Sequence, residues 1–273
     1  MEGGQEMIRD ITIGQYYPVD SPIHRLDPRV KLAGTMMFLV SLFVFSGYLG
    51  YVIAAFFVGV VIKISKVPFR YIVRGLKPVL ILLLFTLLFN VFLTREGTEL
   101  FSWGIIHIYD QGLIIAGLMA VRLILLVLGT SLMTFTTTPN QLTDGLEKGL
   151  RGLKKIKVPV HEIAMMMSIA LRFIPILIEE TDKIMKAQQA RGADFESGKL
   201  LQRAKALVPL LVPLVVSAFR RANDLAMAME ARCYHGGDGR TKMKPLKYKR
   251  RDLIAYLILF GYLGVVIASG FLF

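Results

Sequence analysis

Two arginines, Arg191 and Arg232, lie at the ends of two similar short stretches, which form an internal repeat in this chain. In each stretch the preceding residue is alanine (Ala190 and Ala231), and so is the residue three positions before that. Alanine lets a partner approach closely, and arginine offers a planar, permanently charged fork that fits a carboxylate. A single such end could merely complement a helix dipole, but the repetition favours a partner with two equivalent acidic grooves.

The other residues whose side chains could take part in catalysis or bind a metal form no convincing catalytic or metal-binding group. The four histidines, which are His24, His107, His161 and His235, are not at metal-ligand spacing from one another. No Gly-x-x-x-x-Gly-Lys-Ser/Thr sequence occurs, so we do not expect this chain to hydrolyse ATP. The single cysteine excludes an internal disulfide and a cysteine-based metal cluster. The sequence therefore predicts a non-catalytic protein with no cofactor.

Each arginine ends the charged tail of an apolar run. The runs are Ile163–Ile178, which contains Pro175, and Ala204–Phe219, which contains Pro209 and Pro213. A membrane-spanning helix needs roughly 20 apolar residues, and an internal proline removes a helix hydrogen bond and bends the helix. We therefore predict that neither run spans the bilayer, and that both form long helices that are cytoplasmic or half-inserted at the cytoplasmic face.

The same two runs carry an apolar surface that must be buried against something. The candidate contact residues are Met165, Met166, Met167, Leu210 and Leu214. Methionine side chains repack easily and suit a partner that varies or dissociates. The alternative is that these residues pack only against the protein's own spans.

Composition identifies the chain as an integral membrane protein. Of its 273 residues 54% are hydrophobic, and the apolar residues are clustered in long blocks. The formal net charge is +13, which we assign to loops retained on the cytoplasmic side and to contacts with anionic lipid or an acidic partner. No segment resembles a base-stacking or groove-reading module, so no nucleic-acid partner is expected.

The apolar blocks predict five transmembrane helices with the N-terminus inside and the C-terminus outside. Their expected limits are Leu32–Phe45, Tyr51–Ile64, Pro78–Leu93, Gly112–Phe135 and Leu253–Leu272. The corresponding domains are a cytoplasmic lead-in (1–30), a four-helix transmembrane part (31–136), a cytoplasmic domain (137–251) and a last transmembrane helix (252–273). Arg122 is the one strong charge deep in a span, and we expect it to face protein or water.

A short motif precedes the first span. Asp27 is expected to be the N-cap of this helix, and Pro28 suits its first position, where no backbone donor is lost. Arg29 and Lys31 are expected to hold this end at the cytoplasmic headgroups.

In these features the chain resembles the T components of energy-coupling factor (ECF) transporters, the EcfT/CbiQ family. The resemblance is carried by Leu26–Lys31, by Ala190-Arg191-Gly192, and by Ala231-Arg232-Cys233 followed by Tyr234-His235-Gly236. It implies an all-α integral membrane protein with about five transmembrane helices and a cytoplasmic coupling domain containing two long crossing helices. Each helix would insert its arginine into a groove of one ATPase subunit, with Ala190 and Ala231 allowing close seating. Cys233 stands where the simple pattern has glycine.

The resemblance also implies a function and partners. The chain would be the T subunit of an ECF-type ABC importer in a prokaryotic inner membrane, working with two ABC ATPase subunits (EcfA and EcfA′-like). A small membrane S component that binds a vitamin or metal ion would pack on the apolar side of the coupling helices. A T subunit dedicated to cobalt or nickel uptake is the alternative within the family. A self-sufficient secondary carrier is the alternative outside it, although a carrier would need repeated spans and broken or charged helices at mid-membrane.

Overall fold

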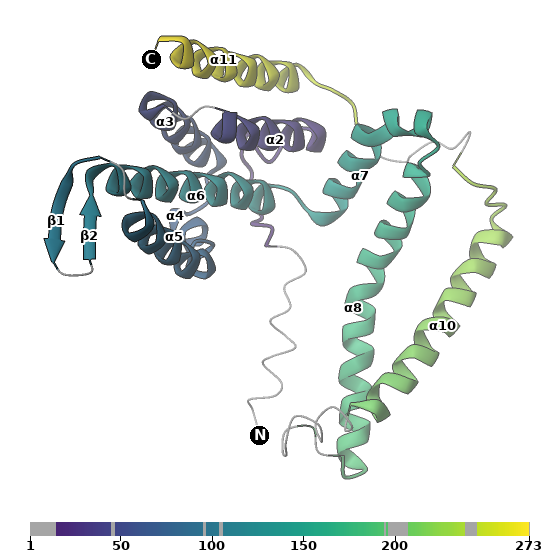
Figure 1. Cartoon of the computed structure of the whole chain (residues 1–273). Helices are drawn as coiled ribbons and strands as arrows, with labels where there is room; N and C mark the ends of the chain where they lie inside the picture. The colour runs from purple at the N-terminus through teal and green to yellow at the C-terminus, as the bar shows by residue number, and fades with distance from the viewer. Residues whose placement is uncertain are drawn as a thin grey trace. The chain divides into compact units, whose positions relative to one another are not determined.

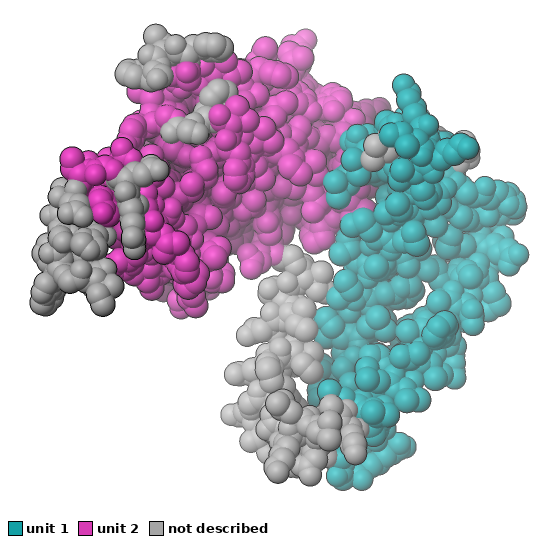
Figure 2. Space-filling model, viewed as in Figure 1, with its two compact units in different colours: residues 1–13, 146–245 teal, residues 14–145, 246–273 magenta. Residues whose placement is uncertain are grey.

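The computed structural model describes residues 15–44, 47–94, 97–103, 106–193, 195, 207–237 and 245–272. It divides into two compact units, coloured separately in Figure 2. Unit 1 comprises residues 1–13 and 146–245, and unit 2 comprises residues 14–145 and 246–273. The division falls inside helix α7 (Pro139–Gly149).

Unit 2 is a bundle of apolar helices with α6 in contact with most of the others (Figure 1). Its elements in chain order are α2 (Pro28–Val44), α3 (Tyr48–Ser65), α4 (Phe69–Arg74), η1 (Lys77–Val79), α5 (Leu80–Leu93), β1 (Glu99–Trp103), β2 (Ile106–Tyr109), α6 (Asp110–Thr136) and α11 (Arg250–Leu272). The expectation of a helical, multi-pass membrane protein is confirmed. The sequence analysis missed the hairpin β1–β2, which pairs in antiparallel register from Glu99 with Tyr109 to Trp103 with Ile106.

Five helices of the described residues are long and apolar enough to cross a membrane, and they are not quite the predicted five. They are α3, the stretch Phe69–Leu93, α6, α8 (Val160–Ala190) and α11 as far as Gly270. Helix α2 has only 17 residues, which is at the short end of the spanning range. It packs against α3, α6 and α11 in the same bundle, so we keep it as a span. The location of α8 at the cytoplasmic face stays a prediction.

A glycine on α6 makes room for an aromatic ring of the bundle core. A Cβ atom added at Gly129 would lie 2.7 Å from Cε1 of Phe38, a buried residue of α2. We expect Gly129→Ala to destabilise the chain by about 1–2 kcal/mol, because the overpacking penalty exceeds the gain in helix propensity. Thermal unfolding in detergent measures this. Gly117→Ala in the same helix, where a Cβ atom meets nothing within 4 Å, is the matched control. Full additivity of Gly129→Ala with Phe38→Leu would contradict the contact, because residues that touch are not additive.

The carboxyl end of α6 is satisfied by groups from far earlier in the chain. The Nζ atom of Lys31 donates to the carbonyl oxygen of Thr136 at 2.7 Å and to that of His24 at 3.1 Å. The backbone N–H of Tyr17 donates to the carbonyl of Phe135 at 2.9 Å. A cation at this end also complements the helix dipole. Lys31 is only 8% exposed, so the expectation that it lies at the headgroups was wrong.

His24 completes this connection from the segment before α2. Its Nδ1 atom lies 2.7 Å from the Ser21 hydroxyl, and its Nε2 atom lies 3.1 Å from the carbonyl oxygen of Tyr17. Burial and the nearby ammonium of Lys31 hold the pKa of His24 below its ordinary value. The ring is therefore neutral at pH 7, donating from Nε2 to the carbonyl and accepting from the hydroxyl at Nδ1.

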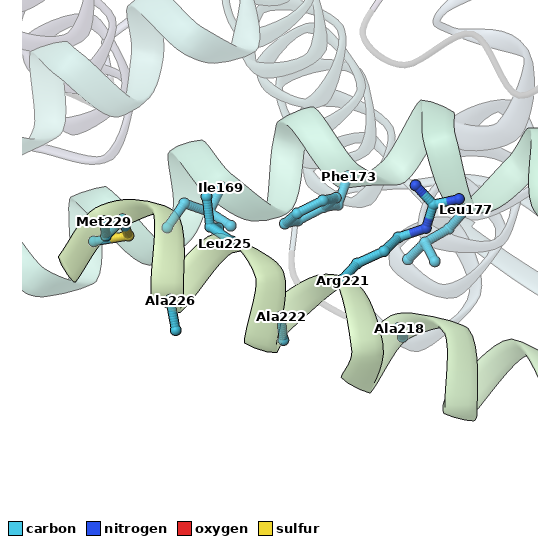
Figure 3. Close-up of a pocket in the computed structure, with 9 residues that line it drawn as sticks. All are labelled: Ile169, Phe173, Leu177, Ala218, Arg221, Ala222, Leu225, Ala226 and Met229. Atoms are coloured by element: carbon cyan, nitrogen blue, oxygen red, sulfur yellow. The ribbon is translucent and has the colours of Figure 1, made fainter. Parts of the chain in front are cut away.

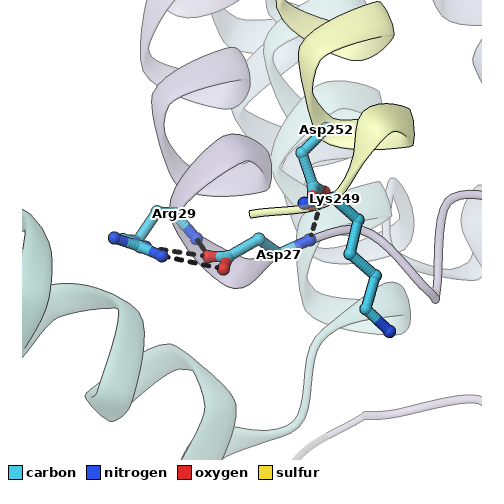
Figure 4. A network of polar contacts seen from close by, with 4 residues as sticks. All are labelled: Asp27, Arg29, Lys249 and Asp252. Atoms are coloured by element: carbon cyan, nitrogen blue, oxygen red, sulfur yellow. Dashed lines mark hydrogen bonds and ion pairs between the residues drawn. The ribbon is translucent and has the colours of Figure 1, made fainter. Parts of the chain in front are cut away.

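The motif before α2 joins the start of α2 to the start of α11 (Figure 4). Asp27 is the expected N-cap, since its Oδ1 atom accepts from the backbone N–H of Arg29 at 3.0 Å. Asp252, at the start of α11, accepts from the backbone N–H groups of Asp27 (2.9 Å) and of Lys249 (2.7 Å). The Arg29 side chain pairs with the Asp27 carboxylate at 3.0 Å and stacks 3.9 Å from the Tyr248 ring centroid. Arg29 is thus held within the protein rather than extended to the headgroups.

Arg122 faces protein, as predicted. Its Nε atom donates to the Tyr51 hydroxyl at 2.8 Å, and its guanidinium carbon lies 5.6 Å from the ring centroids of both Phe43 and Tyr51. The aromatic faces and the hydroxyl stabilise a charge that lipid would not.

Candidate functional site

The two predicted long helices, called the arms below, are continuous. Helix α8 runs for 31 residues through Pro175, and α10 (Val208–Ala231) runs for 24 residues through Pro213. Pro209 lies in the first turn of α10, where its missing N–H costs nothing, so the expectation that it bends a helix was wrong. Residues 204–206 of the second apolar run lie outside the described residues.

Within unit 1 the two helices form an antiparallel pair (Figure 1). The carboxyl end of α8 lies beside the start of α10, where the side-chain amide of Gln188 reaches the carbonyl of Pro209 at 3.4 Å. Further along, Arg221 of α10 pairs with Glu180 of α8 at 2.7 Å. An apolar groove between the helices is lined on the α8 side by Ile169, Phe173 and Leu177, and on the α10 side by Ala218, Arg221, Ala222, Leu225, Ala226 and Met229 (Figure 3).

The repeated sequence ends fold into the same cap. At the end of α8, the N–H of Gly192 donates to the carbonyl of Gln189 (2.9 Å) and that of Ala193 to the carbonyl of Gln188 (3.0 Å). At the end of α10, the N–H groups of Cys233 and Tyr234 donate at the same offsets, to the carbonyls of Glu230 (2.8 Å) and Met229 (3.1 Å). Both patterns are Schellman motifs, in which the last carbonyls of a helix accept from the N–H groups of a residue with positive φ and of the residue after it.

Cys233 occupies the position that Gly192 occupies in the first cap. The φ angles are +54° at Cys233 and +88° at Gly192. Cysteine therefore replaces the glycine of the simple pattern without changing the cap, which is the same in both places.

The conformation of these caps predicts opposite effects of two substitutions. A side chain in the left-handed region destabilises the folded state by roughly 1–2 kcal/mol. Glycine avoids this penalty, but it loses more backbone entropy on folding, which offsets part of the gain. We therefore expect Cys233→Gly to stabilise the chain and Gly192→Ala to destabilise it, each by about 1 kcal/mol. Thermal unfolding of the two variants against wild type measures both effects. Destabilisation by Cys233→Gly would contradict the assigned cap.

Both arginines lie on the surface of the described part of unit 1. Arg191 and Arg232 are the C-caps of α8 and α10, and both are exposed, as are Ala190, Gly192, Ala231 and Cys233. Among the described residues neither guanidinium has a salt bridge. The antiparallel pairing places the two arginines at opposite ends of the helix pair. The site therefore presents two cations, one at each end of the helix pair, and each follows a helix that ends in the same backbone cap.

The predicted apolar contact residues are only partly on the surface. Met166 and Met167 are exposed, and Met165 and Leu214 are half-buried. Leu210 is buried. The sequence analysis missed a continuous exposed face of α10, formed by Val208, Leu211, Val212, Val215, Val216 and Phe219. The helical period of these positions could have separated this face from that of Leu210.

The cap of α10 leads back to the start of α8. Gly237 lies so close to the His161 ring that a Cβ atom there would be 2.1 Å from its Cδ2 atom. The Nδ1 atom of His161 lies 2.9 Å from a carboxylate oxygen of Glu147, at the end of α7. The segment that follows Arg232 is therefore packed against the start of α8 at Gly237.

The profile of the CbiQ family, described as "Cobalt transport protein", matches residues 20–243. The chain belongs to the CbiQ family. It is 59% identical over 252 residues to the "Energy-coupling factor transporter transmembrane protein EcfT" of Clostridium kluyveri, which covers 92% of this chain and 93% of that one. It is 49% identical to proteins of the same name from Ruminiclostridium cellulolyticum (98% of this chain, 100% of that one) and Bacillus subtilis (90% and 93%).

Membership of the CbiQ family agrees with the resemblance identified from the two arginine motifs. The match to the profile includes both caps and all of α8 and α10. This CbiQ-family chain is thus a multi-pass membrane protein of the transporter class named by its relatives.

Proposed function

We propose that this chain is the coupling subunit of an ECF transporter, which transmits ATP-driven motion of two separate ATPase subunits to a substrate-binding S component. One observation carries the proposal: α8 and α10 end in the same cap, and each cap presents an exposed arginine without a partner in the described chain. A guanidinium held this way fits an acidic groove. Two related ATPase subunits would supply two such grooves.

In this mechanism the ATPases grip Arg191 and Arg232 and move together when they bind ATP. Ala190 and Ala231 let each groove close against the helix end. The helices carry the motion to the exposed apolar side chains of unit 1, where Met166, Met167 and the face of α10 would contact the S component. The S component would then tilt and release its vitamin or metal ion on the cytoplasmic side.

Purification in mild detergent tests the composition of the complex. We expect two ABC ATPase chains and one small membrane protein to co-purify with the chain, and the identity of the small protein gives the substrate. A small protein specific for cobalt or nickel would favour the dedicated subunit over a shared one. Transport by the purified chain alone in liposomes, driven by an ion gradient, would support the secondary carrier instead.

The orientation of the arms is tested with the exposed native thiol beside Arg232. We expect a membrane-impermeant maleimide to label Cys233 from the cytoplasmic side only. In a Cys233→Gly background, Ala193→Cys places the thiol beside Arg191, and it should label from the same side. Labelling of the two positions from opposite sides would mean that α8 or α10 crosses the bilayer, and would contradict the proposal.

A further inference from the structure

The ion pair between α8 and α10 joins equivalent positions of the two repeats. Glu180 lies eleven residues before Arg191, and Arg221 lies eleven residues before Arg232. Their side chains meet at 2.7 Å. Two similar segments that run antiparallel contact each other at equivalent positions only at the axis that relates them. The ion pair therefore marks a local two-fold axis of the helix pair.

Contacts on either side of the ion pair agree with this register. Gln188 contacts Pro209 toward the end of α8, and Ile169 lines the groove with Met229 toward the end of α10. Equivalent positions of the two repeats are 41 residues apart. Gln188 is equivalent to Met229, and Pro209 is equivalent to the position next to Ile169, so the two regions of contact are equivalent to each other. Arg191 and Arg232 then lie on opposite sides of the axis, each about 16 Å along its own helix.

Opposite charges suit the contact at this axis. A repeat copied faithfully would set like against like here, and two glutamates or two arginines in contact repel each other. Glu180 and Arg221 differ in charge, so the contact at the axis is an attraction. The adjacent equivalent positions, Glu179 and Arg220, carry the same two charges but are exposed, and no salt bridge within the described chain involves them.

The surroundings of the pair hold it in place between the helices. The Glu180 and Arg221 side chains are 25% and 38% exposed, and the Nε atom of Arg221 is inaccessible to solvent. Figure 3 shows Arg221 extending from α10 toward α8 beside Leu177. Among the described residues this is the one salt bridge between α8 and α10. The other polar contact, from Gln188 at 3.4 Å, is long for a hydrogen bond.

We propose that the Glu180–Arg221 ion pair fixes the register of α8 against α10, that is, how far one helix is shifted along the other, and thereby sets the positions of Arg191 and Arg232 relative to each other. Both residues are positioning residues, since neither reaches a cap. The geometric part concerns this chain alone, whereas its consequence for transport rests on the proposed function.

Distance measurement between spin labels tests the geometric part in the full-length chain reconstituted in nanodiscs. Labels at Lys186→Cys and Met227→Cys, two exposed and equivalent positions, report the separation of the arms in a Cys233→Gly background. We expect one narrow distance distribution with the native pair. Glu180→Gln or Arg221→Gln should widen the distribution and shift its mean. The matched controls Glu179→Gln and Arg220→Gln should leave it unchanged.

Exchange of the two charges separates a specific ion pair from a general loss of structure. The double variant Glu180→Arg, Arg221→Glu should recover the narrow distribution that each single change loses. An unchanged distribution in both glutamine variants would overturn the proposal, and so would failure of the exchanged pair to recover it.

The transport consequence is measured as substrate taken up per ATP hydrolysed in the assembled complex. We expect Glu180→Gln and Arg221→Gln to lower this ratio while the ATPases remain bound, and the exchanged pair to restore it. If the labels respond as expected but no ATPase binds even the native chain, the proposed function fails and the ion-pair geometry stands. If the ATPases bind and the ratio does not change, the transport consequence is wrong.

Discussion

Replacing both Arg191 and Arg232 by alanine is expected to abolish ATP-driven uptake while leaving the chain folded in the membrane. Both side chains are exposed and make no salt bridge within the described chain, so their removal costs little folding energy. In the docked complex each guanidinium would be desolvated against a carboxylate. Truncating one partner of such a pair costs about 2–5 kcal/mol, which is roughly 30-fold to several-thousand-fold in affinity.

Single and double variants distinguish two independent contacts from one. Arg191→Ala or Arg232→Ala alone should weaken retention of the ATPases, and the double variant should lose them entirely. Arg→Lys keeps the charge but not the bidentate fork, so it should recover only part of the affinity. The measurements are co-purified ATPase per chain and uptake into cells or proteoliposomes. Lys186→Ala removes an exposed cation from the same helix and serves as the control. Wild-type uptake by the double variant would rule the mechanism out.

Lys31→Met is expected to produce the largest loss of stability, about 3 kcal/mol, because it leaves one buried and one partly buried carbonyl group without this donor. These carbonyls belong to Thr136 and His24, and the lysine side chain is almost fully enclosed. Methionine keeps the aliphatic length but supplies no donor, and it removes the cation from the end of α6.

Thermal unfolding in detergent measures this loss. Lys63→Met replaces an exposed lysine near the end of α3 and should change the midpoint little. An unchanged midpoint for Lys31→Met would mean that the lysine is at the surface, as its place in the sequence first implied.

Much of this protein could be predicted from patterns that are local in the chain. The apolar blocks identified a multi-pass helical membrane protein, because about 20 apolar residues in a row have few other stable environments. Asp27 was recognisable as an N-cap because capping depends on the two residues that follow it. The two arginine ends were recognisable because their repetition is visible in the sequence itself, and the family comparison agrees with the family resemblance that they carry.

Tertiary structure decided the features that depend on distant neighbours. Lys31 looked like a headgroup anchor until the end of α6, 105 positions away, was seen to supply one of its acceptors. Asp252 joins α11 to Asp27 across 225 positions. Cys233 adopts the backbone of a glycine because the surrounding cap requires it. The meeting of Glu180 with Arg221 follows from the antiparallel register of two helices. Local sequence specifies which faces a helix has, whereas packing decides what each face meets.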